Sequence, residues 1–120
     1  WKLKNIEKEK IKKKDKFTIS LEENKDIIKH ISNHNSLRPK LVIGFAAETN
    51  NLSQNSLNKI REKNCDWIIA NDVSNKSIGF DSDFNEVTIH YKNNDKEKIY
   101  RTKKNLLSDE IVERIIFNIN

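Results

Sequence analysis

The 120 residues, of which 35% are hydrophobic and 34% charged, are sufficient for one small domain with a thin core. No apolar run approaches the length of a membrane-spanning helix, and no signal peptide pattern is present. The single cysteine, Cys65, excludes a disulfide framework and a cysteine-based zinc site, and it favours a cytoplasmic protein. Because the chain begins with Trp1 and contains no methionine, we expect it to be a piece of a longer protein.

The net charge of +5 lies in a basic arm, residues 1–16, where eight lysines accompany three acidic residues and the rest of the chain is neutral. Two interpretations of this arm stay open. A solvated, partly disordered terminus has such a composition, and so does a segment that binds nucleic acid or another polyanion. The chain has only four arginines, although arginine is the residue that most often reads DNA bases.

Residues 17–21 alternate apolar and polar side chains, which predicts a half-buried strand. Asn24 is expected to cap a following helix, with Asp26 in its first turn. This helix should end before Arg38 and Pro39, because the residue before a proline disfavours helical backbone.

The middle of the chain predicts two buried strands separated by a helix. Residues 40–46 (KLVIGFA) contain a continuous apolar run after Lys40, which is typical of a strand covered on both faces in a parallel sheet. An amphipathic helix is expected over residues 54–64, and a second buried strand over residues 67–70.

The last part predicts an irregular loop over residues 73–84 and a strand over residues 86–91. Residues 99–100 are expected to return along that strand as a hairpin. A final helix should begin at Thr102 or Ser108.

This order of elements predicts an α/β fold: a Rossmann-like sheet with parallel strands flanked by helices, plus a C-terminal hairpin and helix. In such sheets ligands bind beyond the carboxyl ends of the strands. Glu48 follows one predicted strand, and Asn71 and Asp72 follow the next. We therefore predict a crevice wall formed by these three residues, although Glu48 would also suit a helix cap or a lysine partner.

Lys59 and Lys63 lie four residues apart on the predicted helix and therefore share a face. Two neighbouring ammonium groups either bind an anion between them or only add solubility, and their spacing alone leaves both alternatives open.

The sequence assigns no metal ligand. His30 and His34 have helical spacing but lack the acidic residue of a metalloprotease motif. Asp72, Asp81 and Asp83 contain oxygen ligands for magnesium, but they match no calcium loop and also suit structural turns.

Several motifs occur together in an order that is similar to one family: residues 9–13 (EKIKK), 24–28 (NKDII), 44–50 (GFAAETN), Lys59 with Lys63, 70–73 (ANDV) and 79–85. The chain resembles phosphopantothenate–cysteine ligase. Specifically, it is similar to the C-terminal synthetase domain of the bacterial bifunctional phosphopantothenoylcysteine decarboxylase/synthetase. The resemblance covers essentially the whole chain, and residues 1–120 would be the C-terminal part of the ligase domain.

The resemblance implies a CTP-dependent ligase of coenzyme A biosynthesis. CTP would convert the carboxylate of 4′-phosphopantothenate to an acyl-cytidylate, and the amine of L-cysteine would then displace CMP. Mg²⁺ is the implied metal, a homodimer the implied assembly, and neither nucleic acid nor a membrane is an implied partner. FMN belongs to the decarboxylase domain, which this sequence does not contain.

The resemblance also implies roles for particular residues. Lys10 would be catalytic, because it neutralises phosphate charge during activation. The family commonly has proline at the position of Lys25, and both residues are tolerated in a first helical turn. The implied nucleotide-binding set is Lys10, Lys25, Asp26, Ile27, Ile28, Phe45, Lys59 and Lys63.

The family's glycine-rich loop and its acyl-cytidylate asparagine are absent from this sequence. We therefore expect that these 120 residues alone do not complete the reaction. The choice between CTP and ATP stays open. A small basic nucleic-acid-binding module is the alternative function, and a diverged remnant that binds nothing is a third.

Overall fold

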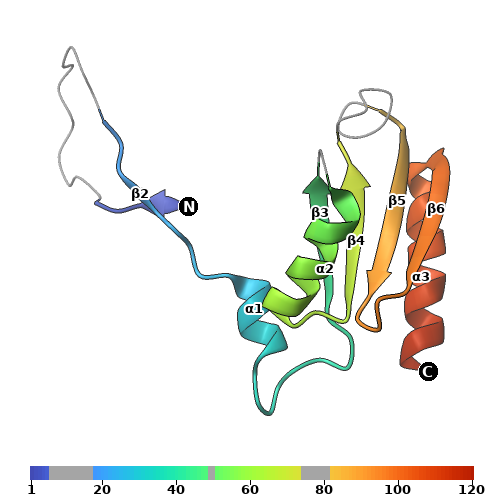
Figure 1. Cartoon of the computed structure of the whole chain (residues 1–120), viewed down its shortest axis with the longest axis horizontal. Helices are drawn as coiled ribbons and strands as arrows, with labels where there is room; N and C mark the ends of the chain where they lie inside the picture. The colour runs from blue at the N-terminus through green and yellow to red at the C-terminus, as the bar shows by residue number, and fades with distance from the viewer. Residues whose placement is uncertain (6–17, 49–50, 74–81) are drawn as a thin grey trace.

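The computed structural model describes residues 1–5, 18–48, 51–73 and 82–120. A four-stranded sheet with helices on both faces forms the body, and the N-terminal segment extends away from it (Figure 1). Among the described residues, no helix has the length and apolar character needed to cross a membrane.

The elements in chain order are β1 (Lys2–Leu3), β2 (Leu21–Glu22), α1 (Ile27–Ser32), β3 (Ile43–Glu48), α2 (Leu52–Lys63), β4 (Trp67–Asp72), β5 (Phe84–Tyr91), β6 (Lys96–Lys103) and α3 (Lys104–Ile119). The sheet has the order β3-β4-β5-β6. β3 and β4 are parallel, whereas β5 runs antiparallel to both β4 and β6. The predicted α/β fold with a C-terminal hairpin and helix is confirmed, with one parallel pair in the sheet.

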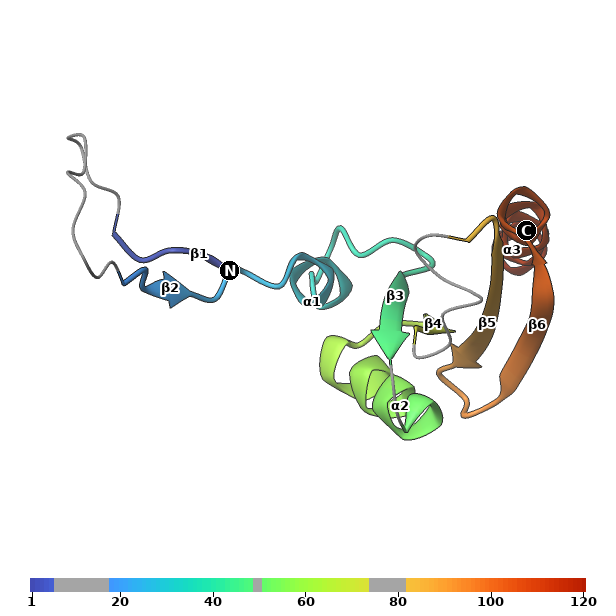
Figure 2. The same cartoon turned by 90° about the horizontal axis from the view of Figure 1, so that it is seen from above.

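Each face of the sheet has its own apolar core, and the two helices α2 and α3 lie on opposite faces (Figure 2). The core beneath α2 also receives Ile28 from α1 and consists of Val42, Ala46, Ile60, Cys65, Ile68 and Ala70. The core beneath α3 consists of Trp67, Ile69, Val87, Ile89, Ile99 and Leu107. The alternation of side chains along β3 and β4 therefore decides which residues reach α2.

The strand expected at residues 17–21 is not part of the main sheet. Leu21–Glu22 instead pairs antiparallel with Lys2–Leu3 in a separate two-stranded ribbon, and Phe17 lies outside the described residues. Ile19 and Leu21 remain 58% and 53% exposed. The prediction of a half-buried strand was therefore wrong for the described residues 18–20, and Leu21, the one residue of the range in a strand, is exposed. An alternating pattern carries no information about which strand becomes its neighbour.

Helix α1 is shorter than predicted, because it begins later and ends earlier in the chain than its expected limits. Asp26, not Asn24, is the N-cap, and its Oδ1 accepts a hydrogen bond from the Lys29 N–H at 3.1 Å. The helix ends at Ser32, well before Arg38, because Asn33 Nδ2 donates to the Lys29 carbonyl at 2.7 Å and closes the last turn.

Arg38 connects the segment after α1 to the sheet. Its Nε donates to the Ser32 carbonyl at 2.9 Å, and its Nη2 lies 2.9 Å from a carboxylate oxygen of Asp66. Asp66 Oδ2 also accepts the backbone N–H of Val42 at 2.7 Å. This bonding fixes the start of β3 and β4 relative to α1.

The remaining boundaries differ from the predicted ones by a few residues. β3 begins at Ile43 and continues to Glu48, and β4 continues to Asp72. The final helix begins at Lys104, between the two expected starts, because the hairpin strand β6 continues to Lys103. Most of the loop expected over residues 73–84 lies outside the described residues.

His90 on β5 predicts a loss of stability in mild acid. Its side chain is 1% exposed and its Nε2 has no hydrogen-bond partner among the described residues. Burial, and secondarily the charge of Lys96, lowers the pKa of His90 below 6.5. The unfolded chain therefore binds a proton first as the pH falls below about 6.5, and the folded state loses stability there, by at most about 1.4 kcal/mol per pH unit.

Urea unfolding between about pH 7.5 and pH 5.5, above the range in which ordinary carboxyl groups titrate, measures this effect. The His90→Leu variant should lose most of the pH dependence, while His30→Leu, at an exposed position of α1, should retain it. Equal pH dependence in the unmodified protein and in His90→Leu would exclude His90 as the cause.

Candidate functional site

The two lysines of α2 each face a carboxylate from a different element. The Lys59 ammonium donates to Oε1 of Glu48 on β3. The Lys63 Nζ lies 3.0 Å from Oδ2 of Asp26, the N-cap of α1. The predicted placement of both lysines on one helix is confirmed. Each ammonium group is part of an ion pair within the chain, so neither is merely a solubilising surface charge.

Glu48 stands at the carboxyl end of β3, where the strand meets α2. Asn55 Nδ2 donates to its Oε2 at 3.0 Å, while Lys59 bonds the other carboxylate oxygen. Asn55 and Lys59 are four residues apart and so approach Glu48 from one face of α2. The Lys59 ammonium, assisted by Asn55, holds the pKa of Glu48 below its usual value, so this side chain is a carboxylate at neutral pH.

Asp26 connects α1 to α2. The hydrogen bond from the Lys29 backbone N–H is the main cause that lowers the pKa of Asp26, and the hydrogen bond from the Lys63 ammonium is the second. The side chains of Lys63 and Asp26 are 28% and 38% exposed, so solvent screens the pair and its contribution to stability is modest.

The neighbours of Asp26 in the predicted nucleotide-binding segment have different surroundings. The Lys25 ammonium lies 3.5 Å from Nε2 of His30, and Ile27 is 70% exposed. Ile28 packs on the core beneath α2, where its Cδ1 is 3.2 Å from the position that a Cβ on Gly44 would occupy. Gly44 thus allows α1 to approach the sheet closely.

Phe45 lies on the opposite face of the sheet from the α2 lysines. Its neighbours Gly44 and Ala46 point toward α2, and its partner on β4 is Ile69, which belongs to the core beneath α3. The Phe45 side chain is 74% exposed. Within the described residues, the structure does not bring Phe45 together with Lys59 or Lys63.

Asn71 and Asp72 end β4 beside the end of β3, where Asp72 is the register partner of Glu48. By strand alternation Asp72 lies on the α2 face and Asn71 on the other. The Oδ1 of Asn71 is buried without a hydrogen-bond partner among the described residues. The expected crevice wall is therefore divided between the two faces of one sheet edge.

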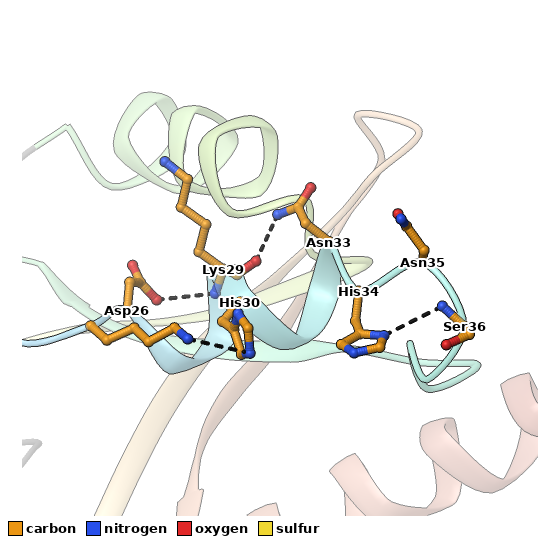
Figure 3. Close-up of a pocket in the computed structure, with 8 residues that line it drawn as sticks. Asp26, Lys29, His30, Asn33, His34, Asn35 and Ser36 are labelled. Carbon is orange, nitrogen blue, oxygen red and sulfur yellow. Dashed lines mark hydrogen bonds between the residues drawn. The ribbon is translucent and has the colours of Figure 1, made fainter.

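A cavity of about 730 Å³ lies beside α1 (Figure 3). Its charged lining side chains are two lysines and Asp26, with two histidines beside them. Neither Lys59 nor Lys63 lines it, so it joins the candidate site only through Lys25 and Asp26. Its lining residues are Lys25, Asp26, Lys29, His30, Asn33, His34, Asn35 and Ser36.

The described residues do not form a metal site. They contain no group of three or more His, Cys, Asp or Glu side chains that would hold a metal ion. His34 Nδ1 accepts backbone N–H groups of Ser36 and Leu37 at 3.3 and 3.1 Å, which gives it a structural role. Asp81 and the predicted catalytic Lys10 lie outside the described residues.

Asn55 is the site residue that the sequence analysis missed. It lies four residues before Lys59, and this spacing would have placed it on the lysine face of the helix. Its contact with Glu48 depends on where β3 ends, which is two residues beyond the predicted end at residue 46.

Comparisons with known proteins support the similarity that the motifs indicated. A family described as "DNA/pantothenate metabolism flavoprotein C-terminal domain" matches residues 1–118. The chain is 42% identical over 113 residues to the Coenzyme A biosynthesis bifunctional protein CoaBC of Escherichia coli strain K12, covering 88% of this chain and 28% of that protein. It is 40% identical over 116 residues to the protein of the same name from Borreliella burgdorferi, covering 94% of this chain and 28% of that protein.

A solved structure has the same fold. The crystal structure of the C-terminal domain of Coenzyme A biosynthesis bifunctional protein CoaBC superposes with a TM-score of 0.64 at 33% sequence identity. The match covers 81% of this chain and 43% of that domain. The chain is thus an α/β domain of the kind that forms the C-terminal part of CoaBC. It belongs to the DNA/pantothenate metabolism flavoprotein C-terminal domain family.

The position of the α1 cap predicts an ordered set of stabilities. Asp26→Ala removes both the acceptor for the Lys29 N–H and the ion-pair partner of Lys63. It should lower the free energy of unfolding by about 0.5–2 kcal/mol. Asp26→Asn keeps a capping oxygen and should cost less. Asn24→Ala, at the residue expected from sequence to be the cap, should leave urea unfolding unchanged. If Asn24→Ala lowered the free energy of unfolding as much as Asp26→Ala, the assignment of Asp26 as the cap would be contradicted.

Proposed function

We propose that this chain supplies part of the nucleotide site of a CTP-dependent phosphopantothenate–cysteine ligase in coenzyme A biosynthesis. The observation that carries the proposal is that Lys59 and Lys63 share one face of α2 and that Lys59 pairs with Glu48 at the carboxyl end of β3, in a family whose named relatives serve coenzyme A biosynthesis. This end of the strands is where open α/β sheets usually bind ligands.

The proposed reaction explains why cations are needed. A free carboxylate is a poor electrophile. In the first step a carboxylate oxygen of 4′-phosphopantothenate attacks the α-phosphorus of CTP, and pyrophosphate leaves. In the second step the amine of L-cysteine attacks the acyl carbon, loses a proton, and CMP leaves as the amide forms. The first step brings a triphosphate to another anion, so ammonium groups lower the barrier by offsetting this repulsion.

In this proposal Lys59 and Lys63 exchange their carboxylate partners for phosphate oxygens. Without nucleotide, Glu48 and Asp26 hold the two ammonium groups in place and limit their freedom. Lys59 is 37% exposed and Lys63 28% exposed, so both are accessible to a ligand in the described structure. The lysines are thus partly ordered before the nucleotide arrives, which lowers the entropy lost on binding.

The other residues of the predicted set keep proposed roles. Lys10 would be the catalytic lysine, and Phe45 would contact the nucleotide from the face of the sheet opposite α2. Mg²⁺ would enter with the triphosphate, since this ion commonly binds through substrate phosphates and one or two carboxylates. We assign it no step of the reaction.

We further propose a cytoplasmic homodimer. Cys65 is a free, buried thiol, which is compatible with a reducing compartment. The N-terminal ribbon exposes Leu3 and Leu21 at 49% and 53%, and a second copy would cover such apolar side chains.

CTP binding tests the nucleotide site. CTP should raise the thermal unfolding temperature of the protein, because a ligand that binds only the folded state stabilises it. Lys59→Gln and Lys63→Gln should each weaken CTP binding by about tenfold, because each removes a charge-assisted phosphate contact. Lys104→Gln, at an exposed position on α3, is the matched control and should bind CTP normally.

The same assay separates the alternative functions. Tight duplex DNA binding with a steep salt dependence, together with indifference to CTP, would favour a nucleic-acid-binding module. Indifference to CTP, Mg²⁺ and phosphopantothenate together, without DNA binding, would favour a remnant that binds nothing.

A separate prediction concerns turnover. The 120-residue chain mixed with CTP, 4′-phosphopantothenate, L-cysteine and Mg²⁺ should release no pyrophosphate and form no amide, because the chain lacks family motifs that the resemblance assigns to the reaction. Measurable amide formation by the chain alone would refute this expectation.

A further inference from the structure

The predicted nucleotide contacts come from two helices, so the position of α1 relative to α2 decides whether they act together. Residues 25–28 lie at and just before the first turn of α1, while Lys59 and Lys63 belong to α2. Helix α1 has only six residues, and a helix of that length is not stable by itself in water. Contacts with the rest of the chain must therefore fix where α1 lies, beside α2 (Figure 1).

A polar junction joins the C-terminal ends of the two helices, and Asn64, the C-cap of α2, is at its centre. The Asn64 Nδ2 donates to the Ser32 carbonyl at 3.2 Å and to Asn33 Oδ1 at 3.3 Å. The Asn64 carbonyl accepts a hydrogen bond from Arg38 Nη2 at 3.2 Å. The hydroxyl of Ser32, a residue that is 0% exposed, donates to the Lys63 carbonyl. These five residues form the α1–α2 junction.

Asn64 has two separate roles in this junction. Its φ is 53°, in the left-handed region, which asparagine tolerates and glycine adopts most easily. Glycine would therefore serve equally well as the C-cap of α2. It would not provide the side-chain amide that donates to the end of α1. The side chain of Asn64 thus does something that capping alone does not require.

Helix α1 is attached to Lys63 at both of its ends. At the N-terminal end Asp26 Oδ2 lies 3.0 Å from the Lys63 ammonium, and at the C-terminal end the Ser32 hydroxyl bonds the Lys63 carbonyl. In the proposed function a phosphate group takes the ammonium from Asp26, so the first attachment is lost when the nucleotide binds. The α1–α2 junction then remains, together with the packing of Ile28, to hold residues 25–28 beside the nucleotide.

We propose that Asn64 is a positioning residue of the nucleotide site: its side-chain amide holds α1 against the C-terminal end of α2 while Lys63 binds phosphate. Asn64 itself does not touch the nucleotide. The inference rests on the proposed CTP site and adds to it a residue that acts through α1. Loss of the amide would leave the two lysines in place and would remove the fixed position of α1.

Two matched substitutions separate positioning from capping. Asn64→Gly keeps a residue suited to the left-handed backbone and deletes the amide that reaches α1. Asn94→Gly makes the same change at a φ of 72° in the turn between β5 and β6. Among the described residues, Asn94 donates its backbone N–H to the Tyr91 carbonyl at 3.1 Å and forms no hydrogen bond with α1.

Amide hydrogen exchange tests the junction without nucleotide. Asn64→Gly should speed the exchange of the His30, Ile31 and Ser32 amides by at least about threefold, because local opening of α1 becomes easier. Exchange of the buried β4 amides reports global unfolding and should stay unchanged. Asn94→Gly should leave the exchange of α1 as it is in the unmodified protein.

CTP binding tests the consequence for the nucleotide site. Titration calorimetry should give a CTP affinity about fivefold weaker for Asn64→Gly and unchanged for Asn94→Gly, because a loosely held α1 must be ordered on binding. Arg38→Lys is an independent second variant and should also weaken CTP binding, since it removes the guanidinium donor to the Asn64 carbonyl. Its matched control is Arg114→Lys on α3, because both arginine side chains are 26% exposed and paired with a carboxylate.

The outcomes distinguish this inference from the proposed function. If the unmodified protein does not bind CTP, the proposed function is wrong and the nucleotide part of the inference falls with it. If the unmodified protein binds CTP and Asn64→Gly binds it equally well, only the inference is overturned. Three exchange results would overturn it as well: unchanged exchange of α1 in Asn64→Gly, equal acceleration of α1 and β4, or equal effects of the Asn64 and Asn94 variants.

Discussion

The packing of α2 against β3 and β4 is the interaction on which the candidate site depends. Ile60 of α2 is 3% exposed and meets Ala46 of β3 and Ala70 of β4 in one core. Small side chains on the strands let the helix lie close to the sheet, and this distance brings Lys59 within reach of Glu48. The same core holds Ile28 of α1, whose N-cap Asp26 then meets Lys63. An apolar contact thus sets the positions of the charges.

The two ion pairs have a modest energetic role and a larger positional one. Both lysines are about one-third exposed, so water screens the pairs and they add little to the free energy of folding. Their effect is to hold the Lys59 ammonium at the carboxyl end of β3 and the Lys63 ammonium against α1. In the proposed function, a lysine that exchanges a single carboxylate for a polyphosphate acquires a more highly charged partner without a large change of position.

Local patterns in the sequence predicted which segments form helices and strands better than they predicted which of these elements contact one another. The apolar spacing of Leu57 and Ile60 indicated α2, and the alternation from Val87 to Tyr91 indicated β5, because both patterns reflect burial of one face. The pairing of residues 21–22 with residues 2–3, and the choice of Asp26 over Asn24 as the cap, depend on contacts between distant segments. The opposite placement of Phe45 and Lys59 follows from strand alternation, but only once the first residue of β3 is known. The motif resemblance predicted the family, which the comparisons confirm, while the roles of individual residues stay predictions.

The most direct measurement of the central claim observes the ammonium groups of Lys59 and Lys63 by nuclear magnetic resonance, with each signal assigned by substitution to arginine. The account predicts that CTP shifts both signals as the carboxylate partners are replaced by phosphate, while the signal of Lys104 stays unchanged. Saturation with CTP that leaves the Lys59 and Lys63 signals in place would contradict it, because the nucleotide would then bind elsewhere on the protein.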